Sequence, residues 1–347
     1  MNEYIFVLGR DRGLSLLEVF SFLKARNIKY SVLDQFEDLL ILEMDDLDFS
    51  SILNKFGGVI KIMKKTSMDN LYEGTKNKIF YTLTDYEDSD ELYDQLKKYF
   101  KQEKIKALMK KEFVPSLKVD LDLIYFDGKL YKAIAILNPK EYKLRDEARP
   151  HFDAKSVISI RLAKIMVNLG MLKEGDKLLD PFCGLGTILQ EASLMGIKAY
   201  GSDNDFLMVR KSKENLKGYK NVEVHELDSK KLETKFNDID GIVTEPHMGP
   251  YYTKRVSLVE ANKLKAELDK LYFETLVSCK KVLKRNGRVV MIIPVIKSVQ
   301  GNIDLDINTI IEKAGFVVEQ LDPGISIPYY YSKGKLLDRW IYILKKL

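Results

Sequence analysis

A glycine-rich turn at residues 180–186 is the feature that most constrains this chain. It reads Asp-Pro-Phe-Cys-Gly-Leu-Gly, follows a short apolar run and precedes a helical pattern that starts at Thr187. Gly184 and Gly186 have no Cβ, so the backbone there can approach a ligand closely. A lone turn of this kind also occurs in ordinary strand-to-helix connections. The order strand, glycine turn and helix nevertheless predicts an α/β fold with a ligand at the end of its first strand.

Acidic residues follow the next predicted strands and indicate the ligand. Asp203 ends the strand at 198–201, and Asp228 follows the strand at 222–225. An acid placed about 20 residues after the turn can accept hydrogen bonds from both hydroxyls of a ribose. Asp180 opens the turn, where it would repel a pyrophosphate but attract a cation. We therefore expect S-adenosylmethionine as the cofactor and not a dinucleotide, with Asp228 near the adenine amino group. The predicted cofactor-binding residues are Asp180, Phe182, Gly184, Gly186, Thr187, Asp203 and Asp228.

The fourth predicted strand ends at an acid followed by proline. Ligands of open α/β sheets bind beyond the carboxyl ends of the strands, so Glu245 should face the reactive end of the cofactor. A carboxylate and the carbonyl of Pro246 are two acceptors that can hold both N–H bonds of an exocyclic amine. The alternative is a surface acid at a strand end. The predicted catalytic residues are Glu245, Pro246, His247 and Met248.

These turns resemble those of class I methyltransferases that modify exocyclic amines. Upstream, Arg145–Pro150, Lys155 with Ser156, and Arg161–Leu169 resemble the linker and following helix of THUMP-domain tRNA guanosine N2-methyltransferases. The resemblance extends from about residue 142 to the C-terminus. It implies a seven-stranded, Rossmann-like methyltransferase domain preceded by α+β, ferredoxin-like and THUMP-like RNA-binding parts. It also implies methyl transfer from S-adenosylmethionine to N2 of a guanosine in tRNA, at position 10.

The fourth motif departs from the family pattern. Relatives have Asp-Pro-Pro-Tyr where this chain has Glu-Pro-His-Met, so the aromatic ring that stacks on an extruded base is missing at Met248. His247, or Tyr251 and Tyr252 in the following loop, are the candidates to replace it. Two alternatives therefore stay open: an RNA-binding protein that has lost catalysis, and a methyltransferase acting on an adenine or cytosine amine of RNA or DNA.

Proline and charge replace apolar alternation around residues 138–150, which indicates a boundary there. The expected domains are a ferredoxin-like part (1–66), a THUMP-like RNA-binding module (67–140), a connector with its helix (141–170) and a methyltransferase domain (171–347). In the last of these, a helix over 258–283 is expected to end at Gly287 as its C-cap.

The net charge of +5, from 56 basic and 51 acidic residues, is too small to indicate nucleic-acid binding by itself. Connector residues lie between the predicted RNA module and the cofactor turn, and they either contact RNA or cap helices. The predicted RNA-binding residues are Arg145, Arg149, Lys155, Arg161 and Lys164. A lysine-rich stretch at 97–111 is interleaved with acids and is more typical of a solvated helix face.

Two cysteines far apart in sequence argue against a disulfide framework, and three separated histidines lack the spacing of a metal site. No apolar run of about 18 residues is present. We therefore expect a cytoplasmic enzyme without metal or membrane partner, and a monomer. The resemblance also admits a small activator subunit, which some relatives need.

Overall fold

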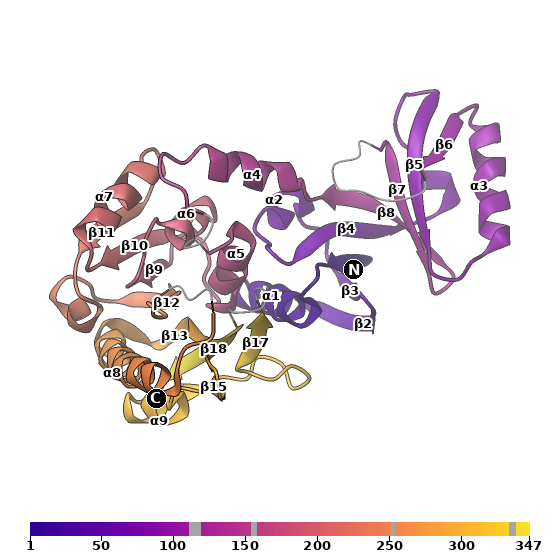
Figure 1. The fold of residues 1–347 in the computed structure, drawn as a ribbon. Helices are drawn as coiled ribbons and strands as arrows, with labels where there is room; N and C mark the ends of the chain where they lie inside the picture. The colour runs from indigo at the N-terminus through magenta and orange to yellow at the C-terminus, as the bar shows by residue number, and fades with distance from the viewer. Residues whose placement is uncertain (111–118, 154–157, 251–253, 333–337) are drawn as a thin grey trace. The chain divides into compact units, whose positions relative to one another are not determined.

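The computed structural model describes residues 1–110, 119–153, 158–250, 254–332 and 338–347 (Figure 1). The chain divides into two compact units. Unit 1 comprises residues 1–16 and 28–147, and unit 2 comprises residues 17–27 and 148–347.

The first half of unit 1 has the predicted ferredoxin-like order. Its strands form an antiparallel sheet in the order β2-β3-β1-β4, and apolar side chains on β1 and β3 are almost fully buried. The elements of this order are β1 (Asn2–Leu8), α1 (Arg12–Ala25), β2 (Tyr30–Phe36), β3 (Leu39–Met44), α2 (Phe49–Leu53) and β4 (Val59–Thr66). The residues of α1 from Leu17 onward belong to unit 2.

The second half of unit 1 continues the same sheet. β4 pairs antiparallel with β8, so the parts expected at 1–66 and 67–140 share one eight-stranded sheet that ends β8-β7-β5-β6. The Asp-Gly pair at residues 127 and 128 is typical of a β-hairpin turn, and the apolar runs on either side of it predict one. The structure confirms this hairpin between β7 and β8, and both turn residues have positive φ, as a type I′ turn requires. The elements are η1 (Met68–Asn70), β5 (Lys78–Asp85), α3 (Asp90–Gln102), β6 (Lys106–Lys110), β7 (Leu121–Phe126), β8 (Lys129–Ile136) and α4 (Pro139–Glu147).

Unit 2 contains the predicted Rossmann-like sheet. Its strand order is β11-β10-β9-β12-β13-β18-β16; the first five strands are parallel, and β18 lies antiparallel beside β13. The elements are α5 (Ile160–Leu169), β9 (Lys177–Asp180), α6 (Thr187–Leu194), β10 (Lys198–Asp203), α7 (Phe206–Asn215), β11 (Val222–Glu226), η2 (Ser229–Thr234), β12 (Ile239–Thr244), α8 (Leu258–Val282), β13 (Leu283–Pro294), β14 (Ile296–Ser298), β15 (Gly301–Ile303), α9 (Ile307–Lys313), β16 (Phe316–Val318), β17 (Tyr329–Ser332) and β18 (Asp338–Lys346).

Helices cover both faces of the unit 2 sheet. Leu179 and Ile242 belong to the core cluster that includes apolar residues of α8 and α9. Their strand neighbours Leu178 and Val243 are also buried and must point the other way, because side chains alternate along a strand. A Cβ on Gly170, at the end of α5, would lie 3.4 Å from the Val243 side chain, which places α5 on that second face. Parallel sheets need this double cover.

The predicted cap at Gly287 is wrong. α8 ends at Val282, and β13 begins at the next residue, so Gly287 lies inside a strand. A Cβ at this position would lie 2.6 Å from the Leu283 side chain and 2.8 Å from the Asp240 carbonyl oxygen. Close approach of neighbouring chain segments, and not helix termination, therefore explains the glycine.

Candidate functional site

The strand ends predicted to carry the site are brought together at one edge of the unit 2 sheet. Strand order reverses between β9 and β12, which is where open α/β sheets bind their ligands. Thr244 at the end of β12 donates a 2.7 Å hydrogen bond from Oγ1 to Oδ1 of Asp180 at the end of β9. The backbone N–H of Leu227, after β11, donates to the Asp203 carbonyl at 3.0 Å. These bonds join the end of β12 to that of β9 and the end of β11 to that of β10, and the Gly184 N–H, which donates to Asp203 Oδ2, links the two pairs.

The two glycines of the turn have different tasks. Gly184 has φ +49°, and a Cβ built there would meet no atom within 4 Å, so it borders open space. Gly186 has φ +87°, and its Cβ would lie 2.7 Å from the side chains of Leu216 and Ser212. Gly186 therefore permits close packing on α7, and Gly184 leaves room for a ligand. Thr187 is the first residue of α6 and is buried.

Asp180 is a carboxyl group in the interior of the site. Its side chain is 2% exposed, and Oδ1 accepts hydrogen bonds from Thr244 and, at 3.1 Å, from the backbone N–H of Phe182. Burial raises the pKa of Asp180 to about 7, and the nearby carboxylates of Asp203 and Glu245 raise it further. A bound cation would favour the ionised form of this group.

Asp203 stands at the end of β10 beside the turn. Its Oδ2 accepts the Gly184 N–H and its Oδ1 accepts the Asp205 N–H, both at 3.0 Å. Burial raises its pKa. Each carboxylate oxygen has two lone pairs, so the group has more acceptor positions than these two bonds use. Asp228, on the next strand end, caps η2 by accepting the Lys230 N–H at 3.0 Å.

The fourth motif is held by residues that the sequence did not indicate. The Glu245 carboxylate accepts a hydrogen bond from Nη1 of Arg339 on β18; the Glu245 side chain is 13% exposed and that of Arg339 is 5% exposed. The hydroxyl of buried Tyr272, on α8, donates at 2.8 Å to the carbonyl of His247. Pro246 is buried, the residue His247 is exposed and Met248 is half-buried.

Two of the predicted RNA-binding residues are buried inside unit 2. Arg149 is 8% exposed and donates to Gln190 at 3.1 Å and to Thr187 Oγ1 at 2.8 Å. Lys164 is 2% exposed and lies 4.0 Å from Glu191. Buried cations need such partners, and these two groups do not reach the surface. Because both are buried, neither is retained as an RNA contact. Their contacts with α6 could not be read from the sequence.

The other predicted basic residues differ in their surroundings. Arg145, on α4 of unit 1, is half-buried with its guanidinium 5.1 Å from the Tyr142 ring centroid. Arg161 begins α5 and is exposed. Lys155, and the alternative stacking residues Tyr251 and Tyr252, lie outside the described residues.

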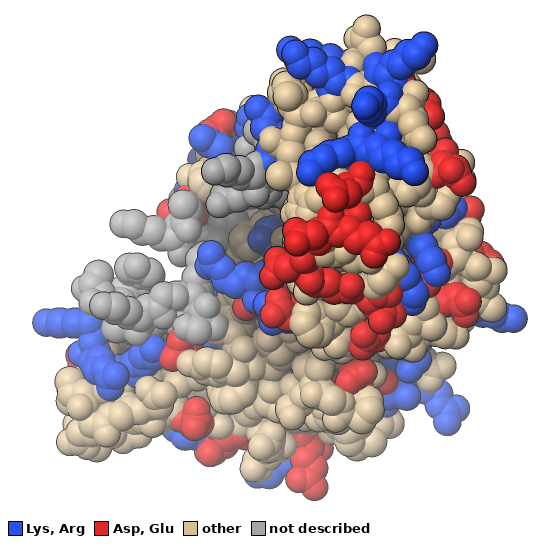
Figure 2. Space-filling model, turned by 90° about the vertical axis from the view of Figure 1, so that its right-hand side faces the viewer, with Lys and Arg blue, Asp and Glu red and all other residues tan. Residues whose placement is uncertain are grey.

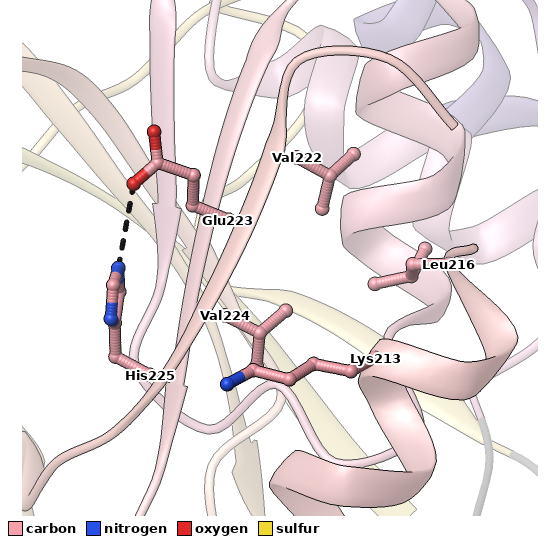
Figure 3. A pocket seen from close by; sticks show the side chains of 6 residues that line it. All are labelled: Lys213, Leu216, Val222, Glu223, Val224 and His225. Carbon is pink, nitrogen blue, oxygen red and sulfur yellow. Dashed lines mark ion pairs between the residues drawn. The ribbon is translucent and has the colours of Figure 1, made fainter. Parts of the chain in front are cut away.

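A hollow of about 310 Å³ lies between α7 and β11, away from the strand ends (Figure 3). It contains none of the acids at the sheet edge, and its one ion pair joins His225 to Glu223 at 3.5 Å. We therefore assign the candidate site to the strand ends and not to this hollow. It is lined by Lys213, Leu216, Val222, Glu223, Val224 and His225.

The acidic side chains and the open backbone at the sheet edge suit S-adenosylmethionine. A buried carboxyl faces a place for a cation, a second acid has acceptor capacity for a ribose, and Gly184 leaves open backbone between them. Among the described residues, no group of three or more His, Cys, Asp or Glu side chains could hold a metal ion. Cys183 and Cys279 are both buried and free. No helix in the described ranges has the length and apolar character to span a membrane.

Two curated proteins match about half to two thirds of this chain. The chain is 34% identical over 169 residues to the tRNA (guanine(10)-N2)-dimethyltransferase of Methanothermobacter thermautotrophicus, which covers 48% of this chain and 47% of that protein. It is 31% identical to the tRNA (guanine(10)-N2)-dimethyltransferase of Pyrococcus abyssi over 64% of this chain and 60% of that protein. The match thus spans about half the length of the first of these relatives.

A solved structure shares the fold over the whole chain. TrmN from Thermus thermophilus superposes with a TM-score of 0.53 at 14% identity, covering 99% of this chain and 100% of that one. The family model of the RMKL-like methyltransferase domain, UPF0020, matches residues 147–314, which include the glycine turn, both ribose-side acids and Glu245. Residues 147–314 are therefore similar to the RMKL-like methyltransferase domain.

Proposed function

We propose that this protein transfers a methyl group from S-adenosylmethionine to N2 of a guanosine in tRNA, at position 10. The observation that carries the proposal is the juxtaposition of Glu245 with Asp180 and Asp203 at the switch point of a methyltransferase domain. The names of the relatives support guanine 10 as the target and two successive transfers as the outcome.

The residues of the chain would share the reaction as follows. S-adenosylmethionine supplies an electrophilic methyl group when bound. Asp180 balances the positive charge, Asp203 accepts hydrogen bonds from the ribose hydroxyls, and Asp228 meets the adenine amine. Glu245 and the Pro246 carbonyl accept the two amine N–H bonds and hold the nitrogen in line, and Glu245 is placed to receive the proton that the amine releases.

Unit 1 would hold the RNA, as a ferredoxin-like part joined to a THUMP-like module. Figure 2 shows the side of unit 1 that carries α3, with basic side chains gathered at one end and acidic side chains in a band below them. The sequence of α3 explains this separation, since Asp90, Glu91 and Asp94 precede its lysines. The basic end can follow a phosphate backbone. The exposed lysines of α3 and of the segment that follows it are Lys97, Lys98, Lys101, Lys104, Lys106 and Lys110. Arg161 adds an exposed cation on unit 2. The proposed enzyme acts in the cytoplasm as a monomer.

The test is incubation of the purified protein with unmodified tRNA and S-adenosylmethionine, followed by digestion to nucleosides and mass spectrometry. N2-methylguanosine or its dimethyl form is the expected product, lost with tRNA that carries adenosine at position 10. Glu245→Gln should bind cofactor normally by calorimetry and fail to turn over. A methylated adenosine or cytidine would replace the substrate. Retained cofactor binding without methylation would contradict the proposal unless adding an activator subunit restored the product.

A further inference from the structure

We propose that Arg339 is the positioning residue for Glu245: it holds the carboxylate ionised and oriented toward the methyl acceptor. The inference rests on the proposed function, because it assigns a partner to the group that would polarise the amine. Arg339 is the second residue of β18, 94 residues from Glu245, and no local pattern in the sequence connects the two.

Arg339 projects from a rigid part of the sheet. Its backbone lies opposite Pro294 of β13 on one side and Tyr331 of β17 on the other. The preceding residue, Asp338, accepts a 2.9 Å hydrogen bond from the N–H of Val295. Glu245 directly follows β12, which pairs with the opposite edge of β13. The two side chains therefore meet across the end of β13, and the arginine anchors a motif residue that lies outside any strand.

The contact differs from that of a structural ion pair in the same sheet. Arg288 on β13 donates to Glu319 with two nitrogens of its guanidinium, Nε and Nη2, the latter at 2.8 Å from Oε1. Arg339 donates to Glu245 from Nη1, and its buried Nε has no hydrogen-bond partner within the described ranges. The Arg339 contact therefore does not use the Nε nitrogen through which Arg288 makes its bidentate pair, which is the stronger arrangement.

The local charges give Arg339 a second effect. Asp180, Asp203 and Glu245 place three carboxyl groups at one edge, and burial has already raised the pKa of Asp180 to about 7. A protonated Glu245 would lose part of its capacity to accept an amine N–H. An opposite charge in direct contact typically lowers a carboxyl pKa by about 1 to 3 units. Arg339 thereby keeps Glu245 in the form that the chemistry needs.

The orientation matters because glutamate is one methylene longer than the aspartate of the usual motif. An unrestrained glutamate samples more rotamers, and misplacement of a reacting group by about 1 Å can cost on the order of 100-fold in rate. Holding one carboxylate oxygen removes most of that freedom. The structure thus explains how a Glu-Pro turn can replace an Asp-Pro turn.

The test compares Arg339→Met and Arg339→Lys with the matched structural pair, Arg288→Met. Arg339→Met should lower kcat about 100-fold, leave the Kd for S-adenosylmethionine within about threefold, and shift the acid limb of the kcat–pH profile upward by about 1 unit or more. Arg339→Lys keeps the positive charge, so the acid limb of its kcat–pH profile should lie near that of the wild type, and its kcat should be partly restored. Arg288→Met should lower the melting temperature and leave the limb unchanged.

If the wild type is active and Arg339→Met keeps its kcat and pH profile, the inference is overturned. It is also overturned if Arg288→Met shifts the acid limb of the kcat–pH profile by the same amount. Failure of the proposed function shows separately, as absence of methylated guanosine with wild-type protein. In that event, NMR titration of protein labelled with ¹³C-glutamate, with Glu245→Gln used for assignment, still decides the point. The carboxyl pKa of Glu245 should rise in Arg339→Met. In Arg339→Lys it should stay near its wild-type value. No rise in Arg339→Met would refute the pairing.

Discussion

Replacement of Asp180 by Asn should make unit 2 more stable at neutral and alkaline pH. The folded protein raises the pKa of this carboxyl from 3.8 to about 7, chiefly by burial. Between about pH 4 and 7, this carboxyl is therefore protonated in the folded state and ionised in the unfolded state. Stability rises with pH only where the unfolded state binds more protons, so this group makes stability fall as pH rises through that window.

The magnitude follows from the size of the shift. A difference of about 3 pKa units corresponds to about 4 kcal/mol at 1.36 kcal/mol per unit, and the group is too deeply buried for solvent screening to reduce it much. Asn keeps an oxygen for the Thr244 and Phe182 hydrogen bonds. The Asn amide also brings a buried hydrogen-bond donor, as the protonated acid does, and the free-energy cost of that donor does not change with pH. The unfolding free energy of the variant should therefore lack most of the decline with pH that the wild type shows.

Urea unfolding between pH 5 and 8 measures this difference. The protein has a single tryptophan, Trp340, in β18 of unit 2, so its fluorescence reports the unit that contains Asp180. This choice matters because a chain of two units need not unfold in one step. Between pH 5 and 7 the wild type should lose about 1.4 kcal/mol per pH unit relative to Asp180→Asn. Parallel stability curves for the two proteins would refute the assignment of a buried, neutral Asp180.

Three further substitutions test the rest of the site. Gly184→Ala should weaken binding of S-adenosylmethionine at least tenfold by calorimetry, whereas Gly128→Ala, which also has positive φ and open space, should cost similar stability and leave binding unchanged; equal binding in both would place the cofactor elsewhere. Asp203→Asn should weaken cofactor binding by about 1.5 to 3 kcal/mol, and an unaltered Kd would contradict the ribose role. Tyr272→Phe removes the bond to the His247 carbonyl, so kcat should fall about tenfold with about 1 kcal/mol lost in thermal unfolding; full activity would show that the loop is positioned without it.

The parts of the fold that depend on local pattern were predictable. The hairpin at Asp127 and Gly128 was predicted because positive φ at both turn positions demands those residue types. The order of strands around the glycine turn was predicted because apolar runs alternate with helical patterns. β6 and α4 were missed, since β6 is mostly exposed and carries no apolar alternation, and α4 lies in a charged segment that begins with proline.

Gly287 shows where local reasoning gives a wrong answer. A glycine after a helical pattern is typical of a C-cap, but here the neighbouring chain approaches so closely that no Cβ fits inside the strand. The connector cations show the same limit. Arg149 and Lys164 look like phosphate contacts in sequence, yet each is buried and pairs with side chains of α6.

The sequence by itself determined which groups stand at the strand ends: the glycine turn, the acids at 180, 203 and 228, and the Glu-Pro turn at 245. These features could be read from short stretches of sequence, because the local backbone conformation depends mainly on residues that are neighbours along the chain. Only the tertiary structure decided which distant residues support them, namely Thr244 against Asp180, Tyr272 against the His247 carbonyl and Arg339 against Glu245. Such partners come from strands and helices that become adjacent only when the sheet assembles, because hydrogen bonds and ion pairs depend on distance in space and not on separation along the chain.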